Sequence, residues 1–215
     1  MRKVTHTLHR MGDIQSLEKD YVLFALADRE INYPRSQEKL RRIWEIISHY
    51  ENDLANFGNL DNGNSHQTNL PALMNAPNHQ YAHAVFKNRE ALKACLKELK
   101  DRDFGLSVVV SGLYEDIRHI CYDMGLRLHT VEFSLGFHGR TERLPGDTSL
   151  AITTMCGHHM VSPSLVTKLA EDIRLGRVTP AEASNELSKQ CCCGVFNPLR
   201  AEKLLRKLTG MPETE

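Results

Sequence analysis

Residues 106–137 read LSVVVSGLYEDIRHICYDMGLRLHTVEFSLGF, and this stretch decides the expected fold class. The apolar run at 106–112 is typical of a buried strand, and 114–125 has the pattern of a helix that ends at Gly125. Residues 128–137 alternate apolar and polar side chains, which predicts a second strand. Two strands joined by a helix of this length are typical of a parallel pair. The sequence therefore predicts an α/β protein with a mostly parallel sheet and flanking helices.

The same patterns extend in both directions from this unit. Short apolar or alternating runs predict further strands at 4–9, 21–27, 81–86 and 149–157, and amphipathic runs predict helices at 36–52 and 88–103. The stretch 56–78 is rich in Asn, Gly and Pro, and we expect a functional or mobile loop there.

The C-terminal third of the chain carries clear helix signals. Three helices are expected to begin at Ser162-Pro163, at the capping box from Thr179 to Glu182, and at Asn197-Pro198. We therefore predict an α/β core domain at 1–150 and a helical, cysteine-containing segment at 151–215 that packs on the same domain.

Composition and charge limit the classes of function. Hydrophobic residues make up 41% and charged residues 25%, as in ordinary globular domains. Lys and Arg total 27, as do Asp and Glu, so the chain lacks the basic footprint of a nucleic-acid-binding protein. The start, MRKVTHTLHRMG, is too polar for a signal peptide, and no apolar run reaches the roughly 18 residues of a membrane span. We expect a cytoplasmic protein with reduced thiols and no nucleic-acid or membrane partner.

The cysteines are the most informative chemistry in the chain. Three of the six are consecutive, Cys191, Cys192 and Cys193, and Gly194 follows them. A fourth, Cys156, ends a predicted strand. Two helices of roughly 12 and 14 residues lie between these cysteines, and an antiparallel hairpin of such helices brings its outer ends together. We therefore expect Cys156 and the triplet to meet, with Cys191 as the thiol that points elsewhere.

Thiolates at one point indicate a soft metal or an iron–sulfur cluster. His158 and His159, in the sequence CGHH, add nitrogen donors, but the paired spacing of a structural zinc site is missing. Adjacent cysteines converge only where the helix unwinds, and a cluster accepts thiolates from several directions. A [4Fe–4S]-type centre on Cys156 and two triplet cysteines is therefore expected, completed by His158, His159 or an open iron, with zinc as the alternative cofactor.

One resemblance points the same way. Cys156 and Cys192-Cys193-Gly194, with residues 157–191 between them, resemble the first part of the CCG cysteine-rich domain of heterodisulfide reductase-type proteins. The likeness covers residues 156–194, and the C-x-x-C that follows in that domain is absent from this chain. Since that domain holds an iron–sulfur cluster, the resemblance implies iron–sulfur binding at these cysteines.

Histidine and arginine supply the remaining candidate catalytic residues. His6, His9 and Arg10 lie in THTLHR near the N-terminus, and His138 and Arg140 follow the stretch quoted first. Guanidinium groups bind carboxylates and phosphates in a bidentate way, and histidine titrates near neutral pH. We expect these residues to line a cleft for a small anionic or sulfur-containing substrate beside the cluster.

These patterns together predict an iron–sulfur protein of anaerobic metabolism. Its cluster would serve catalysis, as in a lyase or an oxidoreductase, or electron transfer with a redox partner protein. Two alternatives stay open: a non-enzymatic protein that binds or delivers zinc, nickel or copper, and a metal-free thiol-dependent enzyme. Cys95 and Cys121 lie on predicted helix faces beside leucine and isoleucine, which favours core packing. A homodimer is compatible with the sequence.

Overall fold

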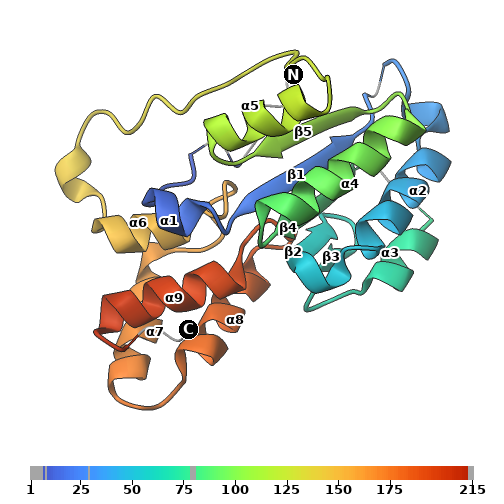
Figure 1. The fold of residues 1–215 in the computed structure, drawn as a ribbon. Coiled ribbons are helices and arrows are strands. Elements are labelled where there is room, and N and C mark those ends of the chain that lie inside the picture. Colours follow the sequence, from blue (N-terminus) through green and yellow to red (C-terminus); the bar gives the residue numbers. More distant parts are fainter. Residues whose placement is uncertain (1–6, 8, 29, 78–80, 213–215) are drawn as a thin grey trace.

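An antiparallel sheet forms the centre of the protein (Figure 1). The computed structural model describes residues 7, 9–28, 30–77 and 81–212, and within them five strands pair in the order β3-β2-β4-β1-β5. Every neighbouring pair is antiparallel. The strands are β1 (Tyr21–Leu26), β2 (Leu54–Asn59), β3 (Gly63–Asn64), β4 (Tyr81–Phe86) and β5 (Ser107–Ser111).

The predicted mostly parallel sheet is wrong because each helical crossover skips a strand. Helix α2 (Gln37–Ser48) leads from β1 to β2, and β4 lies between those two strands. Helix α4 (Arg89–Arg102) leads from β4 to β5, with β1 between them. Strands joined through a helix are therefore never neighbours, which is the split β-α-β arrangement of ferredoxin-like folds. A single sequence contains no signal that tells which strand lies between two strands joined by a helix.

Two other predicted strands are also wrong. Residues 128–137 follow α5 (Tyr114–Asp123) but lie in no helix or strand, although the structure describes all of them. A strand needs a neighbour for its backbone groups, and here Phe133 stays 60% and Leu135 85% exposed. Residues 149–157 begin inside a helix, α6 (Asp147–Thr153), because a short apolar run fits either element.

The remaining predictions of regular structure agree with the fold. The structure confirms the strands expected at 21–27 and 81–86 and the helices expected at 36–52 and 88–103. Their ends agree within one residue, except that α2 already ends at Ser48. The strand expected at 4–9 falls largely on residues 1–6 and 8, which lie outside the described part of the chain.

The three C-terminal helices are confirmed together with their capping signals. They are α7 (Pro163–Arg174), α8 (Pro180–Gln190) and α9 (Pro198–Thr209). The side chains of Ser162, Thr179 and Asn197 accept the expected N-cap hydrogen bonds, and the Thr179–Glu182 capping box is complete. The short elements are α1 (Ile14–Leu17), η1 (Tyr33–Arg35), η2 (Glu51–Asp53), α3 (Leu70–Asn75) and η3 (Thr141–Arg143).

The two faces of the sheet bury different helices. Tyr21, Leu23 and Ala25 of β1 pack in a core with α2 and α4, whereas Val22 packs with Val85 of β4 against the C-terminal helices. This split follows from the alternation of side chains along a strand. Figure 1 accordingly shows α7, α8 and α9 gathered together, away from α2 and α4.

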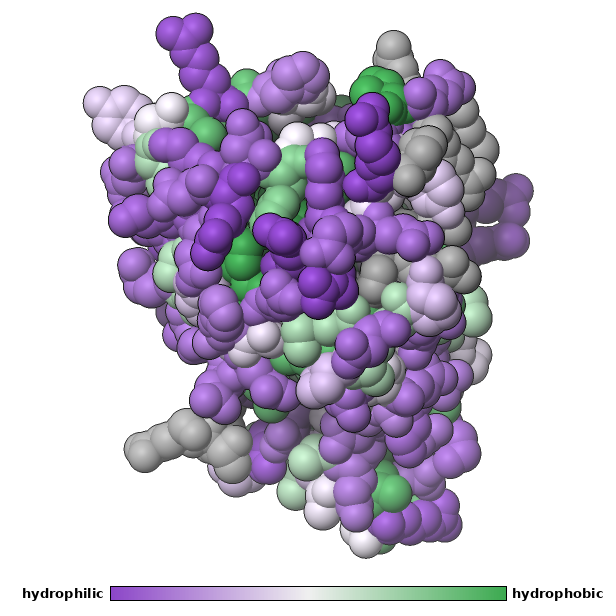
Figure 2. Space-filling view, turned by 90° about the vertical axis from the view of Figure 1, so that its right-hand side faces the viewer, coloured by the Kyte–Doolittle hydropathy of each residue, from purple (hydrophilic) through white to green (hydrophobic). Residues whose placement is uncertain are grey.

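The outward face of the α2 and α3 layer is polar. Figure 2 shows mostly hydrophilic residues on this side of the molecule, with apolar residues in small areas. Exposed ion pairs such as Arg41 with Glu38, 2.8 Å apart, contribute to that surface. In the described ranges no helix is long and apolar enough to cross a membrane.

Candidate functional site

Two turns bring the cysteines together. The first follows α6 and carries Cys156 and His158, and the second follows α8 and carries the cysteine triplet. We call residues 191–196, between α8 and the N-cap of α9, the cysteine turn. Helix α8 ends at Cys191, and Gly194 adopts a φ of +78°, which reverses the chain.

The side chains of four residues form a chain of contacts across these turns. The Sγ atoms of Cys191 and Cys193 are 3.9 Å apart, and the Sγ of Cys193 is 3.7 Å from Nδ1 of His158. The thiols of Cys156 and Cys191 are hydrogen-bonded to each other. The three cysteines have no exposed surface, whereas His158 is exposed. We call Cys156, Cys191, Cys193 and His158 the thiol group.

The other two candidate ligands lie apart from these contacts. Cys192 is partly exposed and lies near Tyr81 on β4. Cys191, which the sequence suggested would point elsewhere, instead lies between two other thiols. His159 is exposed and has a φ of +57°, and its backbone N–H donates to Cys156 O. It makes the turn rather than a thiol contact.

Side chains from the sheet and from the N-terminal segment hold the backbone of the cysteine turn. Four of its carbonyl oxygens accept hydrogen bonds from buried or partly buried side chains. The pairs are Cys191 O with Asn64 Nδ2 (3.0 Å), Cys193 O with His83 Nδ1 (3.1 Å), Phe196 O with Asn56 Nδ2 (2.7 Å), and Val195 O with Arg10 Nη2. A carbonyl only accepts, so Nδ1 of His83 carries the proton. The turn is therefore fixed at both ends and in its middle.

Apart from Arg10, the sequence did not reveal these anchoring residues. Asn56 and Asn64 lie in the stretch 56–78, which was expected to be a loop and instead contains the β2–β3 hairpin. The dipeptide Asn62-Gly63 is a strong hairpin signal and would have located it. Its neighbour β4 contributes His83, whose ring stacks on Phe24 with centroids 4.5 Å apart.

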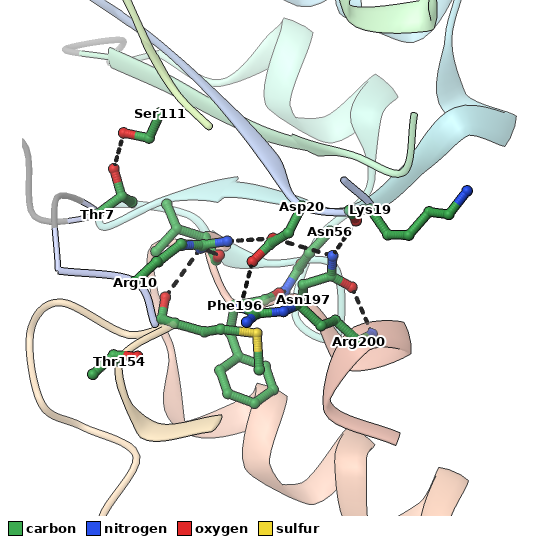
Figure 3. A network of polar contacts seen from close by, with 12 residues as sticks. Thr7, Arg10, Lys19, Asp20, Asn56, Ser111, Thr154, Phe196, Asn197 and Arg200 are labelled. Carbon is green, nitrogen blue, oxygen red and sulfur yellow. Dashed lines mark hydrogen bonds and ion pairs between the residues drawn. The ribbon is translucent and has the colours of Figure 1, made fainter. Parts of the chain in front are cut away.

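Arg10 connects both cysteine-bearing turns to a buried ion network (Figure 3). Its Nη2 donates to Met155 O at 3.1 Å and to Val195 O, and its Nη1 donates to Asp20. Asp20, at the entrance to β1, also accepts from Arg200 Nη1 at 2.8 Å and from Asn197. The guanidinium that the sequence suggested for substrate binding therefore serves, in large part, to position the turns.

Burial and charge act in opposite directions on the pKa values of Asp20 and Arg200. Burial alone would raise the pKa of Asp20, but the guanidinium groups of Arg10 and Arg200 outweigh burial, so the pKa lies below its usual value. Burial lowers the pKa of Arg200, and the carboxylate of Asp20 acts in the opposite direction. At neutral pH, Asp20 is thus ionised between two cations.

The thiols of Cys156 and Cys191 are protonated in the protein without a bound metal. The hydrogen bond to Cys191 and burial raise the pKa of Cys156 far above its usual value. For Cys191, the hydrogen bond from Cys156 favours the thiolate, but contact with Cys193 and burial outweigh it and raise the pKa to about 12. Protonated, inaccessible thiols are poor nucleophiles.

The remaining predicted catalytic residues lie on the surface. His9 Nδ1 contacts Ser134 Oγ at 2.9 Å, and His138 Nε2 contacts Leu135 O at 2.9 Å, and both histidines are exposed. Arg140 is exposed at the start of η3. His6 lies outside the described residues. In the described part of the chain, the hydrogen bonds of His9 and His138 lead to Ser134 and Leu135, and neither these residues nor Arg140 contacts the thiol group.

The thiol group does not yet have the form of a metal-ligand set. In the part of the chain that the structure describes, no three His, Cys, Asp or Glu side chains converge on one centre. The four members of the thiol group form a chain of pairwise contacts instead. No protein-family model, curated protein or solved structure matches this sequence.

Proposed function

We propose that the thiol group binds a resident metal centre through Cys156, Cys191 and Cys193, with His158 as a nitrogen donor on the exposed side. The observation that carries this proposal is that three buried sulfurs and one imidazole follow one another in a chain of contacts on two anchored turns. Neutral thiols gain little from such a gathering, whereas a metal ion binds thiolates strongly and deprotonates them.

The distances support a single tetrahedral ion. Zn–S bonds of about 2.3 Å and Zn–N bonds of about 2.0 Å place neighbouring ligand atoms of a tetrahedron roughly 3.5 to 3.8 Å apart. The Cys191–Cys193 and Cys193–His158 distances of 3.9 and 3.7 Å are close to these edges. Because the four residues form a chain, the side chain of Cys156 or His158 must rotate when a metal binds.

A [4Fe–4S] cluster is the second candidate, favoured by the spacing of Cys156 and Cys192-Cys193-Gly194. Each iron of such a cluster takes one thiolate, so its ligand sulfurs lie on different corners and apart from one another. The contact between the sulfurs of Cys191 and Cys193 supports a single ion better. An iron–sulfur cluster would require the cysteine turn to open.

The surroundings favour a metal that stays in the protein over one that is handed on. A delivery protein exchanges its metal through accessible ligands, but Cys156, Cys191 and Cys193 are fully buried. When bound, the ion would supply a Lewis acid or an electron-transfer centre. Arg10, Asn64 and His83 would hold the turns, and the exposed imidazole of His158 marks the side open to solvent.

Metal analysis of single-cysteine variants tests this proposal. We expect anaerobically purified protein to hold about one zinc or iron ion per chain and no acid-labile sulfide. Cys191→Ser and Cys193→Ser should lose at least tenfold in metal affinity, measured by competition with a chromogenic chelator, since each removes a ligand. Cys121→Ser is the matched control, because Cys121 is partly buried on α5, away from both turns.

The same measurement separates the alternatives. About four irons with equal sulfide per chain would establish the iron–sulfur candidate instead. If Cys191→Ser and Cys193→Ser bind metal as tightly as Cys121→Ser, the metal proposal is wrong. A thiol-dependent enzyme that holds no metal at these cysteines would then be the remaining candidate, and its buried sulfurs would have to react with a small oxidant or electrophile.

A further inference from the structure

We propose that a cavity over β1 and β5 binds a small organic carboxylate with an apolar body. The cavity has a volume of about 400 Å³, within the range of small-molecule sites. It lies between the face of the sheet that carries Phe24 and Val109 and the irregular segment 128–134, which crosses over that face. Figure 1 shows the chain after α5 running as a long irregular segment to α6. This site is separate from the thiol group and does not require a metal.

The apolar wall comes from the sheet and from the crossing segment. Phe24 and Val109 are paired across β1 and β5, so their side chains share one face, and Leu26 continues that face. Val131 and Phe133 of the irregular segment line the opposite side while remaining 41% and 60% exposed. An apolar ligand between the two walls would bury surface that the protein alone leaves in water.

The polar groups gather at the other end of the cavity. Ser111 pairs with Val22 in the sheet, two residues beyond Asp20, so it lies where β1 begins. Its hydroxyl is hydrogen-bonded to that of Thr7, and Arg10 and Asp20 line the same end (Figure 3). The cavity is thus apolar toward Leu26 and polar toward Asp20, which suits an amphipathic ligand lying along β1.

The balance of charge favours a carboxylate over an amine or an alcohol. Arg10 and Arg200 share the single carboxylate of Asp20, which leaves one positive charge in excess in this buried network. The side chain of Arg10 is only 6% exposed, and its Nε has no hydrogen-bond partner among the described residues. A carboxylate at this end of the cavity would supply the missing negative charge. Glu132 also lines the cavity but is exposed to solvent.

The cavity adjoins the cysteine turn through one aromatic layer. Phe24 lines the cavity and stacks on His83, and His83 Nδ1 contacts Cys193 O at 3.1 Å. A ligand along β1 would therefore lie close to the turn that carries the thiols.

Calorimetric titration of metal-free protein with octanoate and octan-1-ol tests the proposal. Both probes have the same apolar chain, so their difference reports the carboxylate. We expect octanoate to bind about tenfold or more tightly than octan-1-ol, the effect of a charge-assisted hydrogen bond. Val109→Phe should fill the cavity and reduce octanoate binding at least tenfold. Val108→Phe places the same side chain on the opposite face of β5 and should leave binding unchanged.

Two results would overturn the proposal. Equal affinity for octanoate and octan-1-ol would show that the cavity does not select a carboxylate. Unchanged octanoate binding by Val109→Phe, with folding verified by thermal melting, would show that the ligand binds elsewhere. Cys193→Ser should bind octanoate like the parent protein. The metal proposal can therefore fail while the carboxylate proposal holds, and the carboxylate proposal can fail while the metal proposal holds.

Discussion

Gly194→Ala is expected to destabilise the protein by about 4 kcal/mol, a loss that approaches the whole stability of many domains. Two effects add at this position. Gly194 has a φ of +78°, where a residue with a β-carbon costs about 1–2 kcal/mol. A β-carbon there would also lie 2.3 Å from the carbonyl carbon and oxygen of Phe57 and 2.6 Å from the amide nitrogen of Gly58. Backbone cannot rotate aside, so the cysteine turn must move away from β2.

Displacement of the turn would break the hydrogen bonds that anchor it. Asn56 and Asn64 would lose their carbonyl acceptors in the turn, and Ser188 on α8 would remain as the acceptor for both amide groups. We therefore expect a second effect besides the loss of stability. The thiols of Cys191 and Cys193 should react faster with a disulfide reagent such as 5,5′-dithiobis(2-nitrobenzoate) in conditions where the variant is still folded.

Gly176→Ala is the matched control for this substitution. Gly176 also has a positive φ, +67°, but a β-carbon there meets no atom within 4 Å. Only the conformational cost of about 1–2 kcal/mol remains. Urea unfolding of both variants measures the difference. Equal losses of stability would show that the close approach of the turn to β2 is not a constraint.

Local signals in the sequence predicted where the C-terminal helices begin and that Cys156 and the cysteine triplet lie close together. Helix caps are short-range features, so Ser162, Thr179 and Asn197 mark α7, α8 and α9 correctly. With those helices in place, Cys156 and the triplet could be expected to lie together, as the contact between Cys156 and Cys191 shows they do. Which thiol turns away could not be predicted, since this depends on the torsion angles around Gly194.

Long-range pairing could not be read from the same sequence. The direction and order of strands depend on which segment inserts between the two ends of a helical crossover, and β4 and β1 insert here. The anchoring of the cysteine turn by Asn64 and His83 could not be predicted for the same reason, because both residues come from strands far from the turn along the chain. Apolar and polar residues do alternate at 131–137, but in the described part of the chain no strand pairs with this segment.

The buried ion network leads to the second large expected effect. Asp20→Asn should destabilise the protein by about 3–5 kcal/mol, the usual cost of removing one partner from a buried ion pair. The side chain of Asp20 is fully buried between those of Arg10 and Arg200, whose side chains are only 6% and 2% exposed. Asparagine would keep a hydrogen-bond acceptor but would leave two buried guanidinium groups without a counter-charge.

The loss should depend on pH in a defined direction. The pKa of Asp20 is lower in the folded protein than the value of about 3.9 in an unfolded chain. A group with a lowered pKa contributes its full stability above the unfolded value and loses it as the pH falls through the folded value. The difference in unfolding free energy between the parent protein and Asp20→Asn should therefore be constant near neutral pH and shrink as the pH falls below about 4.

Glu38→Gln provides the control, because Glu38 makes ion pairs with Arg41 and Arg42 on the exposed face of α2. Water and salt screen such pairs, so little change in stability is expected. Urea unfolding at pH 7 and at pH 3 compares both variants with the parent protein. Because Arg10 joins Asp20 to Met155 O and Val195 O, only Asp20→Asn should also increase the reactivity of the buried thiols. If Asp20→Asn is destabilised but its thiols react no faster, the ion network stabilises the fold without positioning the cysteine turn.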